Sequence, residues 1–209
     1  MRERIALTAR LEDIRERFEV NKVMSVYEPR EAIAPTEDMP IVVGRRQERK
    51  LVESRWGLFP FWAKDAIHAD LQGVLTKQIF DRIVKKQRCI IPSNAVGSVW
   101  EEGKSKHTKR ATIRNQSLFG MAGLYEERVD SNGHAYRSFT VVTAPPNRYD
   151  ASDWGGMPLV LGEEQWDEWL DPSIKDKSYW ENRLHAARNE DWDMTLTDEH
   201  AVPMYTERR

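Results

Sequence analysis

Residues 55–65, with the sequence Arg-Trp-Gly-Leu-Phe-Pro-Phe-Trp-Ala-Lys-Asp, gather the side chains best suited to contact a ligand. Two tryptophans and two phenylalanines lie among three charged residues, which include Arg55 and Lys64. Flat aromatic rings beside cations provide stacking faces and phosphate contacts, as in proteins that bind single-stranded nucleic acids. The same rings can bury much apolar area, so a corner of the core is the competing interpretation, and for the aromatics alone it is the favoured one.

The other reactive side chains form no recognisable constellation. None of the five histidines has metal-ligand spacing to another His, Asp or Glu, so each is predicted to be a solvated surface residue: His68, His107, His134, His185 and His200. Cys89 follows Arg88 in an apolar strand and is predicted to be a buried structural thiol rather than a nucleophile. The sequence lacks a phosphate-cradling glycine loop, paired zinc cysteines and a His-Glu-x-x-His run. We therefore expect no metal and no cofactor.

Composition narrows the class of protein. The chain has 209 residues, of which 40% are hydrophobic and 32% charged, and this balance is typical of a soluble globular protein. A net charge of -2 provides no global basic field, so nucleic-acid binding would need a local basic patch. Residues 104–110 carry four cations that could contact phosphate or form a solvated hairpin tip. No apolar run is long enough to span a membrane, and the start does not resemble a signal peptide. The single cysteine fits a reducing cytoplasm.

The elements expected to position these residues follow from periodicity and turn residues. Apolar residues at helical spacing predict helices over 9–18 (capped by Thr8), 77–87, 163–170 and near 179–188. Apolar, β-branched runs predict strands over 40–43, 50–58, 88–92, 111–114, 118–128, 136–143 and 157–161. Segments 28–38, 65–73 and 144–156 are predicted to be irregular, and 101–109 a polar hairpin turn. This pattern predicts one α+β domain over residues 1–209, with much antiparallel sheet.

Taken together, several stretches resemble the SRAP family (SOS response-associated peptidases, or abasic-site processing proteins). The start, Met-Arg-Glu-Arg-Ile-Ala-Leu-Thr, is similar to the family's Met-Cys-Gly-Arg-Phe-Ala-Leu-Thr. Residues 55–65 are similar to its Arg-Trp-Gly-Leu-Ile-Pro-Phe-Trp-Ala-Lys-Asp, the most specific match. Further matches follow in order at 33–36, 80–92, 121–126, 157–158 and 166–172.

The resemblance implies a fold and an activity. The fold is one α+β domain of twisted antiparallel sheets that form a barrel-like core with flanking helices. Family members bind single-stranded DNA that carries an abasic site. Removal of the initiator Met exposes a cysteine whose amine and thiol close a thiazolidine ring with the sugar aldehyde. An Asn, a Glu and a His surround that site. The same cysteine is thought to cleave a short leader in some members.

Each of those four positions is substituted in this chain. Arg2 replaces the cysteine, and we expect Met1 to stay attached because its removal needs a small second residue. His68 replaces the Asn, and Trp154 replaces the His. The Glu position falls on Ser98 or Val99, because one residue is inserted there. Two DNA-facing arginines are also replaced, by Asp70 and Gly156.

Three hypotheses follow from these substitutions. The first is a catalytically impaired protein that binds single-stranded DNA through Arg4, Trp62, Lys64 and His68. The second is altered chemistry, in which a primary amine (Met1 or Lys64) forms a Schiff base with the abasic aldehyde and His68 acts as base. The third is a protein-interaction module of phage origin, with Arg2 and Trp154 filling the old groove. We rank the first above the third and the third above the second. The oligomeric state and natural ligand stay open.

Overall fold

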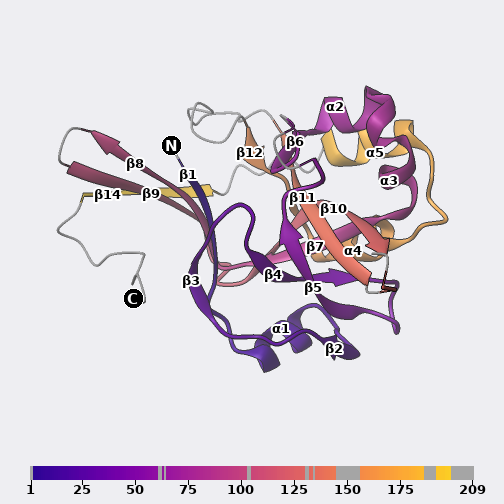
Figure 1. Ribbon diagram of the computed structural model, residues 1–209, viewed down its shortest axis with the longest axis horizontal. Helices are drawn as coiled ribbons and strands as arrows, with labels where there is room; N and C mark the ends of the chain where they lie inside the picture. The colour runs from indigo at the N-terminus through magenta and orange to yellow at the C-terminus, as the bar shows by residue number, and fades with distance from the viewer. Residues whose placement is uncertain are drawn as a thin grey trace.

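The computed structural model describes residues 2–60, 63, 65–102, 105–129, 132–133, 135–144, 156–185 and 192–198. Its strands form two sheets, of nine and five strands, with helices on the flanks of the larger one (Figure 1). The α+β class and the barrel-like core predicted from the sequence are confirmed. Among the described residues, no helix is both long enough and apolar enough to cross a membrane.

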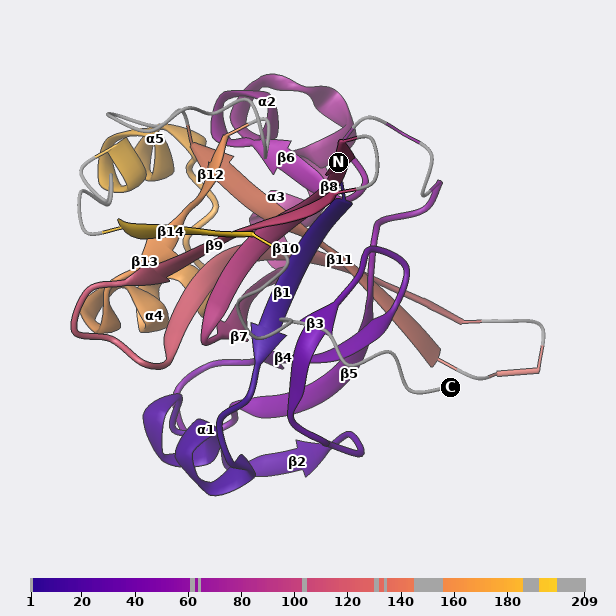
Figure 2. The same ribbon diagram turned by 90° about the vertical axis from the view of Figure 1, so that its left-hand side faces the viewer.

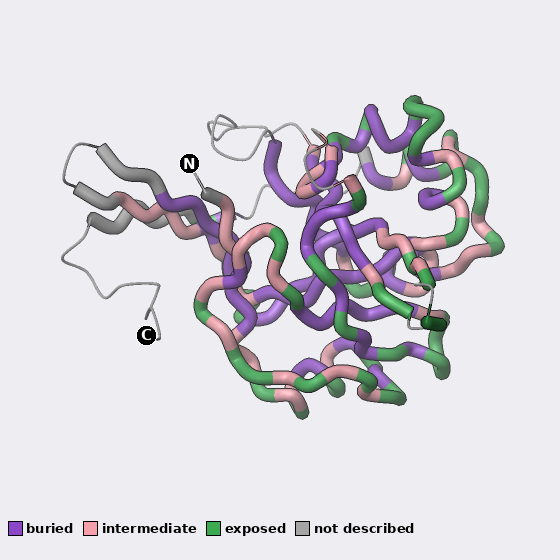
Figure 3. Tube along the Cα trace, viewed as in Figure 1, coloured by how far each residue is buried: buried purple, intermediate pink, exposed green. Residues whose placement is uncertain are grey.

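The larger sheet contains a closed ring of strands. Its pairings run from β4 to β5, β5 to β11, β11 to β10, β10 to β7, and β7 back to β4. The strands of this sheet are β2 (Lys22–Met24), β4 (Asp38–Val43), β5 (Lys50–Trp56), β6 (His68–Asp70), β7 (Arg88–Ser93), β10 (Phe119–Val129), β11 (Ala135–Ala144), β12 (Met157–Pro158) and β13 (Val160–Leu161). Every residue of β7 is buried, as expected for a strand covered on both faces. The interior of the ring forms the core (Figure 3).

The smaller sheet forms a long arm that projects from the barrel (Figure 1). Its strand order is β14-β9-β8-β1-β3. These strands are β1 (Arg2–Leu7), β3 (Arg30–Ile33), β8 (Ala95–Glu102), β9 (Ser105–Ile113) and β14 (Trp192–Asp198). Figure 2 shows β1 in front, with β3 and β8 beside it. The arm therefore carries the first residues of the chain in its interior rather than at its edge.

The helices lie around the barrel. They are α1 (Leu11–Arg17), α2 (Leu71–Thr76), the 3₁₀ turn η1 (Gln78–Phe80), α3 (Asp81–Lys86), α4 (Glu163–Leu170) and α5 (Lys177–His185). Helix α4 packs against β7, and α2 packs against β11 and α5. The Arg88 side chain joins these layers, because its guanidinium donates to the carbonyl oxygens of Val84, Trp169 and Asp171. Burial lowers the pKa of Arg88 to about 10.

The strand predictions for the barrel and the predicted helix over 163–170 are confirmed, with strand ends shifted by at most two residues. The segment 157–161, predicted to be one strand, forms two short strands, β12 and β13, that pair with different neighbours. Four other predictions are wrong. The first helix begins after Arg10, with no side-chain cap, so Thr8 does not cap it. The segment 65–73 contains β6 and the start of α2. The segment 28–38 contains β3, and 101–109 belongs largely to β8 and β9. The predicted loop over 144–156 lies, apart from its two ends, outside the described residues.

Residues 55–65 divide between the two interpretations offered for them. Trp56 is fully buried and stacks on Phe139 with ring centroids 6.4 Å apart, so the core interpretation holds for this ring. Phe59 is 53% exposed, and the Arg128 guanidinium lies 4.9 Å from its ring centroid. Trp62 and Lys64, predicted to contact DNA, lie outside the described residues. The structure therefore assigns part of this stretch to the core and part to the surface.

Candidate functional site

The start of β1 lies against β8, and this pairing brings two of the substituted family positions together. Arg2 is directly opposite Val99, and Glu3 is directly opposite Ser98. Opposed residues of antiparallel strands point to the same face of a sheet. Ser98 therefore shares a face with Glu3, whereas Val99 belongs to the other face. Val99 is 7% exposed and carries no group that could transfer a proton.

His68 reaches the same place from the larger sheet. Strand β6 runs parallel to β11, with His68 beside Val141, and the Val141 amide donates to the carbonyl of Ile67 at 3.1 Å. This pairing directs His68 toward β1, where its Nε2 lies 3.5 Å from Oε1 of Glu3. The two side chains are only 24% and 20% exposed. The prediction of a solvated surface histidine is therefore wrong for His68.

The Glu3 carboxylate is held in its ionised form. Burial on its own would raise the pKa of Glu3, but the hydrogen bond and the charge of His68 outweigh it, so the pKa lies below its ordinary value. Glu3 and His68 thus form a carboxylate–imidazole pair, the arrangement with which proteins hold an imidazole in one orientation for proton transfer.

The face that carries Glu3 continues across the arm. The register places Glu3 opposite Ser98, and Ser98 opposite Lys109 of β9. Ser98 is fully buried, and its hydroxyl has no hydrogen-bond partner in the structure. We call Glu3, Ser98 and Lys109 the cross-strand row. Lys109 is half-buried.

The opposite face of the arm carries cations of its own. Arg4 is opposite Gly97, and Gly97 is opposite Arg110, so both arginines project away from the cross-strand row. Arg110 lies 3.5 Å from a carboxylate oxygen of Glu31 on β3. Arg4, predicted to contact DNA, donates to the Glu3 carbonyl at 2.7 Å, and its side chain lies on the face opposite to that of Glu3.

The SOS response associated peptidase (SRAP) family model matches residues 1–200. The chain belongs to the SRAP family. It is 28% identical over 191 residues to "Abasic site processing protein YoaM" of Bacillus subtilis, a match that covers 87% of this chain and 84% of the relative. It is 29% identical to "Abasic site processing protein YoqW" of Bacillus phage SPbeta, with 87% and 85% covered.

Solved structures show the same fold. A protein of Bacteroides thetaiotaomicron superposes with a TM-score of 0.73 at 20% identity, covering 92% of this chain and 90% of that one. A phage-related protein of Bordetella bronchiseptica superposes with a TM-score of 0.72 at 21% identity, covering 93% of each chain. The fold of this chain is therefore one already seen in solved structures.

Within this SRAP architecture, the described family positions carry changed chemistry. Arg2 and Val99 lie opposite each other at the start of the arm, and His68 contacts the neighbouring Glu3. None of these three residue types carries a thiol or a carboxylate. Trp154, the fourth substituted position, lies outside the described residues. Asp70 caps α2 by accepting a hydrogen bond from the Gly73 amide at 2.7 Å, so its carboxylate has a local structural role.

The site contains one residue that the sequence comparison did not select. Glu3 stands where the family start quoted above has glycine, so the SRAP site gains a carboxylate at a position that had no side chain. The replacement of glycine by Glu3 was the feature of the sequence that could have identified this residue. Its importance emerged only from the register, which places Glu3 beside both His68 and Ser98.

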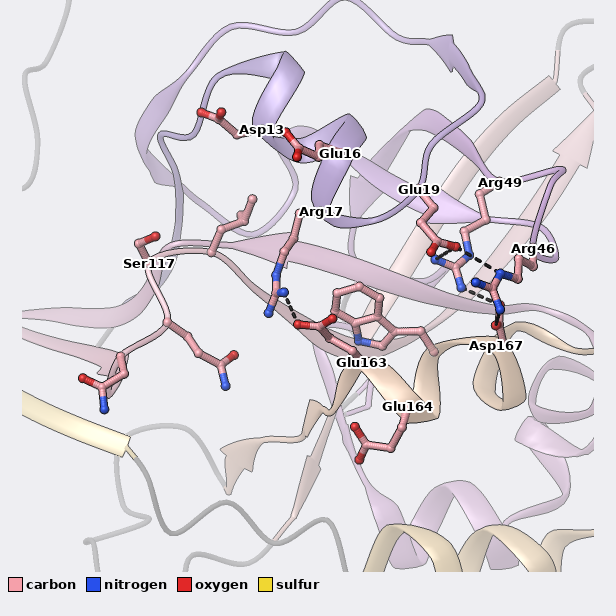
Figure 4. Close-up of a pocket in the computed structure, with 14 residues that line it drawn as sticks. Asp13, Glu16, Arg17, Glu19, Arg46, Arg49, Ser117, Glu163, Glu164 and Asp167 are labelled. Carbon is pink, nitrogen blue, oxygen red and sulfur yellow. Dashed lines mark hydrogen bonds and ion pairs between the residues drawn. The ribbon is translucent and has the colours of Figure 1, made fainter.

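A hollow of about 940 Å³ lies between α1, α4 and the turn after β9 (Figure 4). Its arginines are already paired: Arg17 with Glu163, and Arg49 and Arg46 with Asp167. Arg49 is 2% exposed and also donates to the Phe18 carbonyl at 2.9 Å. These contacts connect α4 to α1 and to the start of β5, so we interpret this hollow as a structural charge cluster rather than the site.

Metal and thiol chemistry find no support at the described positions. In the part of the chain that the structure describes, no three His, Cys, Asp or Glu side chains are grouped so that they could hold a metal ion. Cys89 is fully buried in β7, and burial raises the pKa of its thiol. The prediction of a buried structural cysteine is confirmed.

Proposed function

We propose that this SRAP protein binds single-stranded DNA at the start of its arm and does not form the cysteine-derived cross-link of the family. Family membership and the names of the relatives support DNA as the ligand. One observation carries the loss of the cross-link. The only cysteine in the sequence is Cys89, and it is fully buried with a raised pKa, so no thiol is available to close a thiazolidine ring.

DNA binding would use the cations of the arm's start together with the aromatic stretch. Arg4 follows Glu3 on β1 and points to the other face of the arm, where it can contact phosphate, and Trp62, Lys64 and His68 complete the proposed contacts. A chain acting as one domain over residues 1–209, in the cytoplasm and without a cofactor, is part of the same proposal.

The binding test is a salt titration. We expect a fluorescein-labelled 20-nucleotide single strand to bind in the micromolar range at 25 mM NaCl and at least tenfold more weakly at 200 mM, because phosphate contacts release counterions. Arg4→Glu is expected to weaken binding at least fivefold. Arg15→Glu is the matched control, since Arg15 is exposed on α1, away from the arm. Absence of binding at 100 µM protein in low salt would contradict the proposal.

A second candidate function has one observation in its favour. A relative is encoded by Bacillus phage SPbeta, and a solved structure of the same fold is titled as phage-related. A protein-interaction module of phage origin would bind a host protein instead of DNA. Affinity capture from a bacterial lysate treated with nuclease separates the two functions, because a partner retained without nucleic acid favours the second.

A further inference from the structure

We propose that the outer wall of the barrel carries a second contact area for the DNA strand, in which Phe59 and Tyr136 stack against bases and Arg55 contacts a phosphate. We call Phe59, Tyr136, Arg55 and Arg128 the wall patch. This inference rests on the proposed function, because it takes single-stranded DNA as the ligand. None of these four residues is among the DNA contacts proposed above.

The register of three strands places the wall patch on one face of the larger sheet. Arg128 of β10 is directly opposite Tyr136 of β11. Two positions further along β11, Ser138 is beside Arg55 of β5. Paired residues of neighbouring strands, and residues two apart on one strand, point to the same face of a sheet. This face is the outer one, because Phe139, the next residue of β11, is fully buried in the core.

The side chains of the wall patch are open to solvent. Phe59 is 53% exposed and Tyr136 is 50% exposed. Arg55 is exposed as well, and within the described part of the chain it forms no ion pair. Proteins that bind single strands without reading their sequence combine such accessible aromatic rings with cations that contact phosphates.

Arg128 restrains the Phe59 ring. Its guanidinium lies 4.9 Å from the ring centroid and donates to the Glu126 carboxylate from Nε and from a terminal nitrogen, at 3.3 and 3.0 Å. Because Glu126 neutralises Arg128, this part of the patch suits the stacking of a base better than the binding of a phosphate. A ring that is restrained before binding loses less conformational entropy when a base stacks on it.

Phe59 is also a departure from the family stretch quoted above, which has isoleucine at this position. A phenyl ring provides a flat face on which any base can stack, whereas the branched isoleucine side chain does not. The replacement therefore adds a stacking face to the stretch 55–65.

The spacing of the patch matches one nucleotide. Neighbouring strands lie about 4.8 Å apart and the chain rises about 3.4 Å per residue, which places the backbones of Arg55 and Tyr136 roughly 8 Å apart. A base stacked on Tyr136 can therefore belong to the same nucleotide as a phosphate held by Arg55.

The segment 57–66 connects the patch with the candidate site. The Leu58 amide donates to the Ala66 carbonyl at 2.9 Å, and β6 begins at His68, shortly after Ala66. The pairing of β11 with β6 and with β10 directs His68 and Tyr136 to opposite faces of the sheet. A strand that contacts both areas therefore passes over this segment.

The experiment compares two DNA strands that have the same phosphates and differ in their bases. One is a fluorescein-labelled strand of 20 thymidine nucleotides, and the other carries a tetrahydrofuran in place of every nucleoside. Fluorescence anisotropy at 25 mM NaCl gives the Kd of each strand. We expect Phe59→Ala and Tyr136→Ala to bind the thymidine strand at least fivefold more weakly and to bind the base-free strand with unchanged Kd. Arg55→Ala is expected to weaken the binding of both strands about threefold, because both carry phosphates.

Three further variants provide matched controls. Phe59→Trp keeps a flat ring and is expected to bind the thymidine strand as tightly as wild type. Phe59→Ile introduces the residue of the family stretch and is expected to lose as much affinity as Phe59→Ala. Ile79→Ala removes an apolar side chain that is 67% exposed on η1, outside the patch, and is expected to change neither Kd. Thermal unfolding of each variant verifies that it is folded.

Each outcome decides the inference. A loss of affinity that is confined to the thymidine strand and recovered in Phe59→Trp supports it. An equal loss on both strands overturns it, because Phe59 would then act through the fold or on the DNA backbone. Wild-type binding that neither Phe59→Ala nor Tyr136→Ala weakens also overturns it and leaves the proposed function standing. Absence of binding of either strand by the wild-type protein overturns both.

Discussion

Two charged regions of this protein differ in the number of partners that each charged side chain contacts and in its exposure to solvent. In the hollow between α1 and α4, the Arg49 guanidinium is 2% exposed and contacts the Phe18 carbonyl, Asp167 and Glu19. At the start of the arm, the Glu3 carboxylate and His68 share one contact of 3.5 Å and keep about a fifth to a quarter of their surfaces exposed. A charge held by several partners fixes two elements together. A charge held by one partner, at the edge of the core, stays available for a ligand.

Removal of Arg49 should have the largest effect on stability. We expect Arg49→Ala to lower the free energy of unfolding by about 3 kcal/mol, because the Phe18 carbonyl and the Asp167 carboxylate lose a buried donor. Denaturant unfolding measures the change. Arg46→Ala is the control, since Arg46 is 66% exposed and should cost less than about 1 kcal/mol. If both variants lost the same unfolding free energy, burial and the number of partners would not explain the importance of Arg49.

The Glu3–His68 pair should contribute less, and in a pH-dependent way. The folded pKa of Glu3 lies below its ordinary value of 4.5, so its contribution is present above that pH and is lost as the pH falls through the folded pKa. We expect Glu3→Gln to be less stable than wild type by about 1 kcal/mol at pH 6. In parallel denaturant titrations, this difference in unfolding free energy between wild type and Glu3→Gln should shrink toward zero as the pH falls to 3. A difference that stays constant with pH would show that the effect is not ionic.

The smallest effect is expected at a pair that belongs to neither region. Arg10 and Asp13 form an ion pair on the surface of α1, with side chains 76% and 42% exposed. We expect Arg10→Ala to leave the midpoint of denaturant unfolding unchanged within error, because solvent screens such pairs. This variant provides the baseline against which the two regions are compared. If Arg10→Ala lowered the unfolding midpoint as much as Glu3→Gln does, solvent exposure would not predict how much each charge contributes to stability.

The sequence predicted the elements whose signal is local. Apolar runs identified the barrel strands, and helical spacing with Pro172 beyond its end located α4. The first helix was placed wrongly because its entry is held from a distance: the Thr8 and Ala9 amides donate to Asn94 Oδ1 at 2.7 and 3.0 Å. The strands β3, β6 and β14 depend on partners far along the chain, so their segments carry no distinct pattern.

The site shows the same limit more sharply. Motif comparison selected Arg2 and His68, and the fold brings His68 to Glu3, the neighbour of Arg2 on β1. It could not select Glu3, because the face to which Glu3 points depends on which residue of β1 lies opposite which residue of β8. A shift of one residue would move each side chain to the other face. Register depends on both strands of a pair, so it cannot be predicted from the sequence of one segment alone.

The interior place of β1 also constrains when the protein can become functional during its synthesis. Residues 2–7 leave the ribosome first and can pair with β3, but their other neighbour, β8, begins only at Ala95. Closing such a long loop is entropically unfavourable and slow compared with local pairing. The site therefore cannot exist on a partly made chain. A growing polypeptide therefore leaves the ribosome without the completed arm, and the pairing of Glu3 with Ser98 forms only after β8 has been made.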